Sequence, residues 1–315
     1  MLASLSIDLD GLEHYHRIHG LPGPAPAGDD PVYGKAVERF GELCARLGLR
    51  GTAFCVGRSL SRPGAAAAVR RLAEAGHELG NHTLSHDYAL ARAGAEVIAA
   101  EVRGGADAVA AAAGRAPTGF RAPGYTLTAP LLAALVEAGY RYDSSAFPAL
   151  PYYAAKAVVL AAMAAAGRRS HAVLDRPRVL LAPRVPYRPR DGEPYAAGTL
   201  PLLELPVTTG LLGVPIIGTT VASLPALARA ALAGTRRLPH LNLELHGVDL
   251  LDASDASPAL AARQRDLRVA AAVKIARIEA FVRALAAREW VTLHAAAARL
   301  EPTLPPGRTP VKGGA

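Results

Sequence analysis

Residues 2–11 read Leu-Ala-Ser-Leu-Ser-Ile-Asp-Leu-Asp-Gly, a short apolar run that ends on two carboxylates. Similar β-prone runs recur along the chain, and longer alanine-rich segments of helical period separate them. Strands that alternate with helices in this way form βαβ units, in which neighbouring strands are parallel. The sequence therefore predicts an α/β fold with a mostly parallel sheet. The pattern leaves both a barrel and an open doubly wound sheet possible.

The alternation predicts the following elements. Strands are expected at residues 2–8, 51–56, 119–121, 141–143, 202–207, 241–245 and 290–293. Helices are expected at about residues 34–47, 65–75, 90–113, 130–138, 154–166, 224–233 and 257–287. Residues 177–195 carry five prolines and interrupt the alternation, so this stretch is predicted to be a long loop.

Composition limits the classes to which the chain can belong. With 315 residues, 51% hydrophobic and 20% charged, it has the proportions of a globular protein. The formal net charge is +8, but no compact run of basic residues occurs, so we expect no nucleic-acid partner. No apolar stretch is long enough for a transmembrane segment, and the first residues lack a signal-peptide pattern, so the cytoplasm is the expected compartment. Cys44 and Cys55 are predicted to be buried thiols.

Asp8 and Asp10 lie two positions apart at the end of the first expected strand. In an extended strand, side chains at this spacing project to the same side. One carboxylate could then hold a cation while the other acts as a base. A solvated turn capped by the two aspartates is the alternative.

A second candidate segment reads Gly-His-Glu-Leu-Gly-Asn-His-Thr-Leu-Ser-His over residues 76–86. His82 and His86 are four apart, and on a helical turn they would share one face and reach one metal. Gly80 and Asn81 predict a turn and a cap before His82. Spacing alone is weak evidence, but two histidines with an oxygen of Asp10 would leave open positions, as a catalytic zinc requires.

Two more predicted strands end in residues that can carry chemistry. Arg121 is followed by Pro123 and Gly124, and it could bind a carboxylate through two hydrogen bonds while the turn aims N–H groups at an oxyanion. A loop-stabilising arginine is the alternative. His246 ends the apolar run 241–245, a place where a histidine is more often structural.

In order and content these four segments resemble the polysaccharide deacetylases of the NodB type, carbohydrate esterase family 4. The resemblance extends from about residue 2 to 300 and includes residues 51–57, 139–148 and 203–207. It implies a distorted (β/α) barrel with fewer than eight complete strands and a metal at the carboxyl ends of the strands. It also implies a single catalytic domain over residues 1–300, with an insertion at about 150–200 and a flexible tail at 301–315.

The resemblance further implies roles for individual residues. The metal ligands would be Asp10, His82 and His86, and the metal would be zinc, with cobalt, nickel or manganese as alternatives. Asp8 would be the catalytic base, held by Arg121, and His246 the general acid. The backbone N–H of Tyr125 would help to form the oxyanion hole, next to Pro123 and Gly124, which would contact the substrate.

The sequence departs from the usual family pattern at three positions. Leu9 separates the two aspartates, a variant that resembles the peptidoglycan-deacetylase and allantoinase-like branches. Asp143 matches the aspartate that tunes the acid histidine, but the tryptophan that usually follows it is missing. Glu244 stands two positions before His246, where the family usually has a leucine of the acetyl pocket.

The predicted function is metal-dependent hydrolysis of a linear amide, the N-acetyl group of an amino sugar in a saccharide, a nucleotide sugar or a lipid-linked glycan. Deformylation, opening of a cyclic amide, or glycan binding without turnover are the alternatives on this fold. A basic, aromatic wall for a sugar phosphate, and with it peripheral contact with a lipid-linked substrate, could be formed by Tyr152, Tyr153, Arg184, Tyr187, Arg188 and Arg190. A solvated loop explains these residues equally well. Residues 13–16, Glu-His-Tyr-His, are predicted to be a polar surface loop rather than a substrate contact.

Overall fold

The fold is a curled, parallel β-sheet with flanking helices, and the predicted (β/α) barrel-like fold of the NodB type is confirmed as a half-barrel. The computed structural model describes residues 1–23, 30–168 and 170–308. Within these residues the main sheet has the strand order β9-β1-β2-β3-β4-β5-β8, and β10 pairs with the start of β1. Its strands are β1 (Leu2–Leu9), β2 (Thr52–Cys55), β3 (Glu78–Asn81), β4 (Gly119–Phe120), β5 (Tyr142–Asp143), β8 (Leu203–Glu204), β9 (His240–His246) and β10 (Glu289–Trp290).

The register of this sheet brings its polar strand ends together. Asp8 is the pairing partner of His246 on β9, and Leu9 is the partner of Cys55 on β2. Because all these strands are parallel, their carboxyl ends lie at one edge. The curl also returns the chain beyond β8 to β9, where the Thr208 N–H donates to the Asn242 carbonyl at 3.3 Å.

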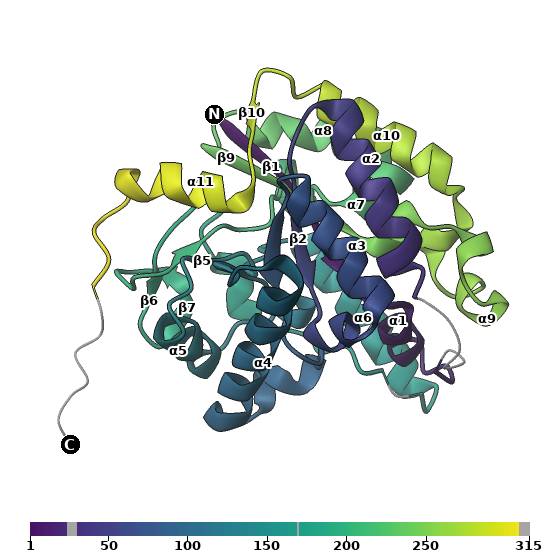
Figure 1. Cartoon of the computed structure of the whole chain (residues 1–315), viewed down its shortest axis with the longest axis horizontal. Coiled ribbons are helices and arrows are strands. Elements are labelled where there is room, and N and C mark those ends of the chain that lie inside the picture. Colours follow the sequence, from purple (N-terminus) through teal and green to yellow (C-terminus); the bar gives the residue numbers. More distant parts are fainter. Residues whose placement is uncertain (24–29, 169, 309–315) are drawn as a thin grey trace.

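Helices cover the sheet because each has an apolar face that needs burial. Figure 1 shows α2, α3 and α10 over one side, with α4 and α5 further along. Helix α2, for example, buries Val37, Phe40, Leu43 and Cys44, which recur at helical spacing. The helices are α1 (Leu12–Ile18), α2 (Val37–Leu47), α3 (Pro63–Glu74), α4 (Ala95–Ala113), α5 (Ala129–Glu137), α6 (Leu150–Ala165), α7 (Gly218–Ser223), α8 (Pro225–Ala231), α9 (Pro258–Ala261), α10 (Ala271–Arg283) and α11 (Leu293–Leu300).

Two predicted elements end earlier than their sequence pattern indicated. The helix expected over residues 257–287 is divided into α9 and α10. Between them the Asp266 carbonyl accepts a hydrogen bond from buried Lys274, which also donates to the Val248 carbonyl. The strand expected over 290–293 stops at Trp290. Helix α11 follows soon after, because the Thr292 hydroxyl caps it by accepting from the Ala295 N–H.

The predicted long loop 177–195 is more regular than expected. It begins with a short 3-10 helix, Pro177–Leu181, and continues into the antiparallel pair β6 (Pro189–Arg190) and β7 (Glu193–Ala197). The buried hydroxyl of Tyr187 donates to the Pro194 carbonyl and ties the two strands together. Tertiary hydrogen bonds therefore organise a stretch whose prolines indicated an irregular loop.

The start of the predicted tail is attached to the rest of the fold. Residues 301–303 form a 3-10 turn, and the Arg308 N–H donates to the Thr199 carbonyl. The remainder of the predicted tail, residues 309–315, lies outside the described residues. Cys44 and Cys55 are buried free thiols, as predicted. None of the described helices is long and apolar enough to cross a bilayer.

Candidate metal and catalytic site

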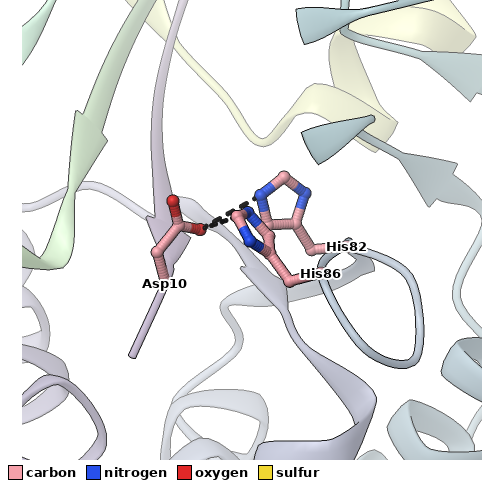
Figure 2. A group of neighbouring side chains, drawn as sticks. All are labelled: Asp10, His82 and His86. Atoms are coloured by element: carbon pink, nitrogen blue, oxygen red, sulfur yellow. Dashed lines mark ion pairs between the residues drawn. The ribbon is translucent and has the colours of Figure 1, made fainter. Parts of the chain in front are cut away.

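Asp10, His82 and His86 converge at the carboxyl edge of the sheet (Figure 2). Asp10 follows β1, and the two histidines lie in the loop that follows β3. One oxygen of Asp10, Oδ1, is 3.1 Å from Nε2 of His82 and 3.1 Å from Nε2 of His86. All three side chains are buried. The structure thus brings the three predicted ligands to one point.

The two histidines do not share a helical turn, contrary to the prediction from their spacing. Residues Glu78–Asn81 form β3, a strand that the sequence analysis missed, and the chain then turns sharply. Thr83 and His86 both have left-handed backbone angles, with φ of 64° and 54°. The Thr83 hydroxyl accepts from the His86 N–H at 3.0 Å and stabilises the turn.

The atoms at the triad fit a divalent cation. Apart from the ion pairs within the triad, Asp10 Oδ1 and both ring nitrogens of His86 are buried without a partner among the described residues. Unpaired buried polar atoms cost free energy, and coordination of a cation would remove that cost. His82 Nδ1 lies 2.7 Å from the Arg121 carbonyl, an outer contact that orients its Nε2 towards Asp10. Two imidazoles and one carboxylate suit zinc and, by the same geometry, several other divalent metals.

The charges at the triad support one another. Burial raises the pKa of Asp10, but the neighbouring His86 and His82 outweigh it and hold the pKa well below its usual value. Burial lowers the pKa of His82, but Asp8 and Asp10 outweigh it and the net pKa is raised. A divalent cation at this point would compete with the proton for His82, because a histidine binds metal in its neutral form.

Asp8 is held by Arg121 on one side and faces the triad on the other. Its Oδ1 is 2.6 Å from Arg121 Nη1, and its Oδ2 is 3.9 Å from His82 Nε2. Arg121 is fully buried and also donates to the Ser6 hydroxyl and to the carbonyl and hydroxyl of Ser144. Burial raises the pKa of Asp8, and the Arg121 charge opposes that rise.

Arg121→Met is expected to lower the free energy of unfolding by about 3–5 kcal/mol, because it leaves the buried Asp8 carboxylate without its charge partner. Urea unfolding followed by circular dichroism measures the change. The control is Arg178→Met, which removes the exposed ion pair with Glu193 and should cost less than about 1 kcal/mol. A cost at Arg121 as small as that at Arg178 would show that the pair contributes little.

His246 lies at the end of β9, where it is the register partner of Asp8 on β1. Its Nε2 is 4.0 Å from Asp10 Oδ2 and 3.3 Å from the Tyr125 hydroxyl, and its side chain is 24% exposed. Burial lowers the pKa of His246, but the Glu244 carboxylate outweighs it and holds the pKa well above its usual value. The raised pKa favours the protonated form of the His246 imidazole, which is partly exposed to solvent.

The turn at residues 123–125 closes over the same edge, with one difference from the prediction. Gly124 and Tyr125 have φ of 65° and 63°. A Cβ at Gly124 would lie 2.8 Å from the Tyr88 ring, so only glycine fits there. The Tyr125 N–H donates to the Ala122 carbonyl at 3.1 Å and is already engaged, so the oxyanion role expected of it is not supported. The Tyr125 group nearest His246 is its hydroxyl.

Comparison with known proteins gives one family match and several similar folds. The model of the polysaccharide deacetylase family matches residues 29–142. This match supports the resemblance to the NodB-type polysaccharide deacetylases over that part of the chain. A candidate polysaccharide deacetylase from Mycobacterium smegmatis has the same fold, with a TM-score of 0.59 and 18% identity over 100% of this chain and 94% of that one. No curated protein matches the chain.

Two other solved structures have weaker similarity to this chain. A family 4 carbohydrate esterase from Streptomyces lividans, in complex with acetate, is 21% identical over 45% of this chain and 61% of its own, with a TM-score of 0.34. A family 4 pseudoenzyme from Bacillus anthracis is 8% identical over 94% of this chain and 65% of its own, with a TM-score of 0.46.

The structure places a different carboxylate beside His246 from the one predicted. Glu244 Oε1 lies 2.9 Å from His246 Nδ1. Asp143, the predicted tuning residue, is fully buried, accepts from the Ser145 hydroxyl and is the register partner of Glu204. The contacts of Asp143 are thus made on the β5–β8 side of the sheet. The residue that contacts the His246 ring is Glu244, and this became visible only from the position of β9 in the structure.

Asp143 and Glu204 form a buried carboxyl pair with two unpartnered oxygens, Oδ2 and Oε2, in the described structure. Burial raises the pKa of both groups, and the adjacent Asp143 charge helps to hold the pKa of Glu204 well above its usual value. A proton on Glu204 relieves the repulsion. The pair holds the Ser145–Ala146 turn, because Ser145 donates to Asp143 and the Ala146 N–H donates to Glu204.

Glu204→Gln is expected to protect the protein against loss of stability at high pH. The pKa of Glu204 is raised in the folded state, so its contribution to stability is complete below the unfolded-state pKa of about 4.5. As the pH rises from there towards the folded-state pKa, the free energy of unfolding falls by about 1.4 kcal/mol per pH unit. Glutamine imitates the protonated form. Urea midpoints at pH 5 and pH 9 should therefore differ less in the variant than in the wild type. Equal pH dependence in the two proteins would exclude a raised pKa at this position.

The basic and aromatic residues of the insertion, considered above as a wall for a sugar phosphate, mostly make hydrogen bonds within the protein. Arg184 donates to Thr209 and to the Gly210 carbonyl, and buried Arg188 binds Glu301 and the Pro305 carbonyl. The wall predicted from the sequence is therefore not available to a phosphate through these two arginines. Of that set, Tyr152 lies at the site, edge-on to Tyr125 with ring centroids 6.2 Å apart.

Residues 13–16 are not the surface loop that the sequence analysis predicted. They lie in α1, where the chain turns back towards the triad because Asp30 accepts from the Leu12 N–H at 3.0 Å. His14 is buried, with its ring centroid 4.3 Å from that of His86. Burial lowers the pKa of His14 to about 2, so the ring is neutral. His14 and His16 follow Asp8 and Asp10 closely in the sequence. This short separation was the feature of the sequence that could have indicated their position near the triad.

Proposed function

We propose that the chain hydrolyses the N-acetyl group of an amino sugar, as a metal-dependent amidohydrolase. One observation carries this proposal: a candidate base and a candidate acid, on adjacent strands, both lie within about 4 Å of the candidate metal triad. Asp8 Oδ2 is 3.9 Å from His82 Nε2, and His246 Nε2 is 4.0 Å from Asp10 Oδ2. Amide hydrolysis requires such a pair, because water must lose a proton on attack and the amine must gain one on leaving.

The residues of the chain divide the reaction between them. A divalent cation held by Asp10, His82 and His86, with zinc as first choice, supplies Lewis-acid polarisation of the acyl carbonyl when bound. Asp8 takes a proton from the attacking water, while Arg121 holds the other oxygen of Asp8 and keeps the carboxylate in place. The new C–O bond forms, and the C–N bond breaks as His246 Nε2 delivers its proton to the nitrogen. The products are acetate and the free amino sugar.

Aromatic side chains around the site suit a sugar substrate. Tyr125 packs edge-on to His246 and to Tyr152, and the Phe147 ring centroid lies 5.0 Å from that of Tyr125 and 4.9 Å from that of Tyr152. Tyr125 and Phe147 are buried, so the partly exposed Tyr152 is the ring that offers a sugar a flat apolar surface with a polar edge. Lys156 Nζ is 3.5 Å from the Gly124 carbonyl and could receive an anionic group on the substrate or its carrier, whether a nucleotide or a lipid.

The test is acetate release by zinc-loaded protein from N-acetylglucosamine, UDP-N-acetylglucosamine, chito-oligosaccharides and a lipid-linked N-acetyl sugar. Release from any of them, lost on chelation and restored by zinc, supports the proposal. Formate from N-formyl analogues, or opening of hydantoin-like rings, in place of acetate would assign the chain to the alternative reactions of this fold. Glycan binding without any acyl product would make it a binding protein.

A further inference from the structure

Glu244 is a buried carboxylate whose one ion-pair partner in the described structure is His246. It lies on β9, two positions before His246, so both side chains project to the same side of the strand. Its Oε1 is 2.9 Å from His246 Nδ1, and its side chain is fully buried. Apart from this ion pair, neither carboxylate oxygen has a hydrogen-bond partner in the described part of the chain.

A fully buried carboxylate is costly unless a charge or a strong donor compensates it. Burial raises the pKa of Glu244, but His246 and Arg121, helped by the nearby Tyr125 hydroxyl, outweigh it, and the pKa is lowered. Arg121 is already paired with Asp8 at 2.6 Å, which leaves the imidazole of His246 as the direct charge partner of Glu244. The leucine usual in the family at this position could not play this part.

We propose that Glu244 is the positioning residue of the general acid His246. This inference rests on the proposed function. By accepting a hydrogen bond from Nδ1–H, Glu244 holds the ring so that Nε2 faces Asp10 and the leaving group. When the C–N bond breaks, the proton on Nε2 passes to the amine nitrogen, and the imidazole is left neutral with its remaining proton on Nδ1, still bonded to Glu244. The arrangement is that of a carboxylate–histidine pair in which the carboxylate sets the tautomer.

The same three side chains, Asp8, Glu244 and His246, could also be considered as ligands of a second cation, because their atoms lie within 4.8 Å of one another. Two contacts favour the positioning role. Arg121 already binds Asp8, and its positive charge opposes a second dication beside it. His246 Nδ1 already faces Glu244, so the nitrogen directed to the triad is Nε2.

The experiment compares two substrates of zinc-loaded wild type, Glu244→Gln and Glu244→Leu. An N-acetyl sugar needs a proton on its leaving amine, whereas 4-nitrophenyl acetate releases a stable phenolate that needs none. The ratio of amide to ester turnover is expected to fall by about 10²-fold in both variants, since general acid catalysis is worth about 10²–10⁴-fold. Glu193→Gln, outside the site, should leave the ratio unchanged. In a His246→Ala background, Glu244→Gln should have no further effect.

A second measurement tests the proposal without turnover. Nitrogen-15 NMR of histidine-labelled, zinc-loaded protein, with the His246 signals assigned by their loss in His246→Ala, reports which ring nitrogen carries the proton. Wild type is expected to keep Nδ1 protonated across its neutral form, and Glu244→Leu to shift the proton towards Nε2. This readout stays valid if no N-acetyl sugar is hydrolysed, so failure of the proposed function and failure of the positioning role are distinguishable.

Three outcomes would overturn the proposal. One is equal loss of amide and ester turnover, which indicates a structural defect. Another is an unchanged Nδ1 proton in Glu244→Leu. The third is a zinc content of two per wild-type chain that falls to one in Glu244→Gln, which would instead assign Glu244 to a second metal.

Discussion

Asp8→Asn is expected to lower kcat on an N-acetyl sugar by about 10²–10⁴-fold, the usual contribution of a general base. Asparagine has nearly the same shape and can still accept from Arg121, but it cannot take a proton from water. The zinc content should remain close to that of wild type, because Asp8 is not one of the three ligands placed around the cation. Acetate release and metal analysis on the same samples measure both effects.

The control for this variant is Asp191→Asn, which changes an exposed aspartate of the β6–β7 turn and should leave kcat unaltered. Because the Asp8→Asn variant leaves Arg121 without its charge partner, thermal unfolding must show that the variant is folded at the assay temperature. A folded, zinc-containing variant with at least a tenth of wild-type kcat would remove Asp8 from the role of base.

His82→Ala is expected to abolish both metal binding and turnover. It removes one of the three proposed ligands, and Asp10 and His86 alone would not hold zinc in a tetrahedral site. Wild type should gain stability from added zinc, about 2.7 kcal/mol at a concentration 100 times the Kd, and the variant should gain none. Metal analysis after dialysis and thermal unfolding with and without zinc provide the two readouts.

His171→Ala, at an exposed histidine far along the chain, is the matched control and should keep the response to zinc. Retention of stoichiometric zinc by His82→Ala would contradict the triad. Together with Asp8→Asn, the variant separates the two functions of the strand ends, since one loses the metal and the other keeps it.

Much of the fold was visible in the sequence because its signals are local. Short apolar runs alternating with alanine-rich helical segments predicted the parallel sheet, and seven of its strands lie within or next to the expected ranges. The strand β3 was missed because Glu78–Asn81 has little β-branched character and is followed by a left-handed turn. The helix that the sequence favoured over residues 257–287 is divided at a place where the Asp266 carbonyl accepts a hydrogen bond from Lys274.

In the candidate site, too, local sequence determined some features and long-range contacts determined others. The sequence was sufficient to nominate Asp8, Asp10, His82 and Arg121, because polar residues that follow apolar parallel strands must meet at one edge of the sheet. It could not show which neighbour each group would meet there. Glu244 rather than Asp143 lies beside His246, because partners across a curled sheet depend on register and on which side of the strand each residue faces.

Residue types and their order along the chain were therefore enough to predict the sheet and to nominate the residues of the candidate triad, since these depend on short segments and on the common direction of parallel strands. The role of His246 as acid came from the family resemblance and not from its own segment. The contacts of the Tyr125 N–H, the burial of His14 and the engagement of Arg184 and Arg188 were decided only by tertiary packing. The physical reason is that hydrogen-bond partners and burial depend on segments far apart in the chain. A local sequence pattern does not say how far apart such segments lie in the folded structure.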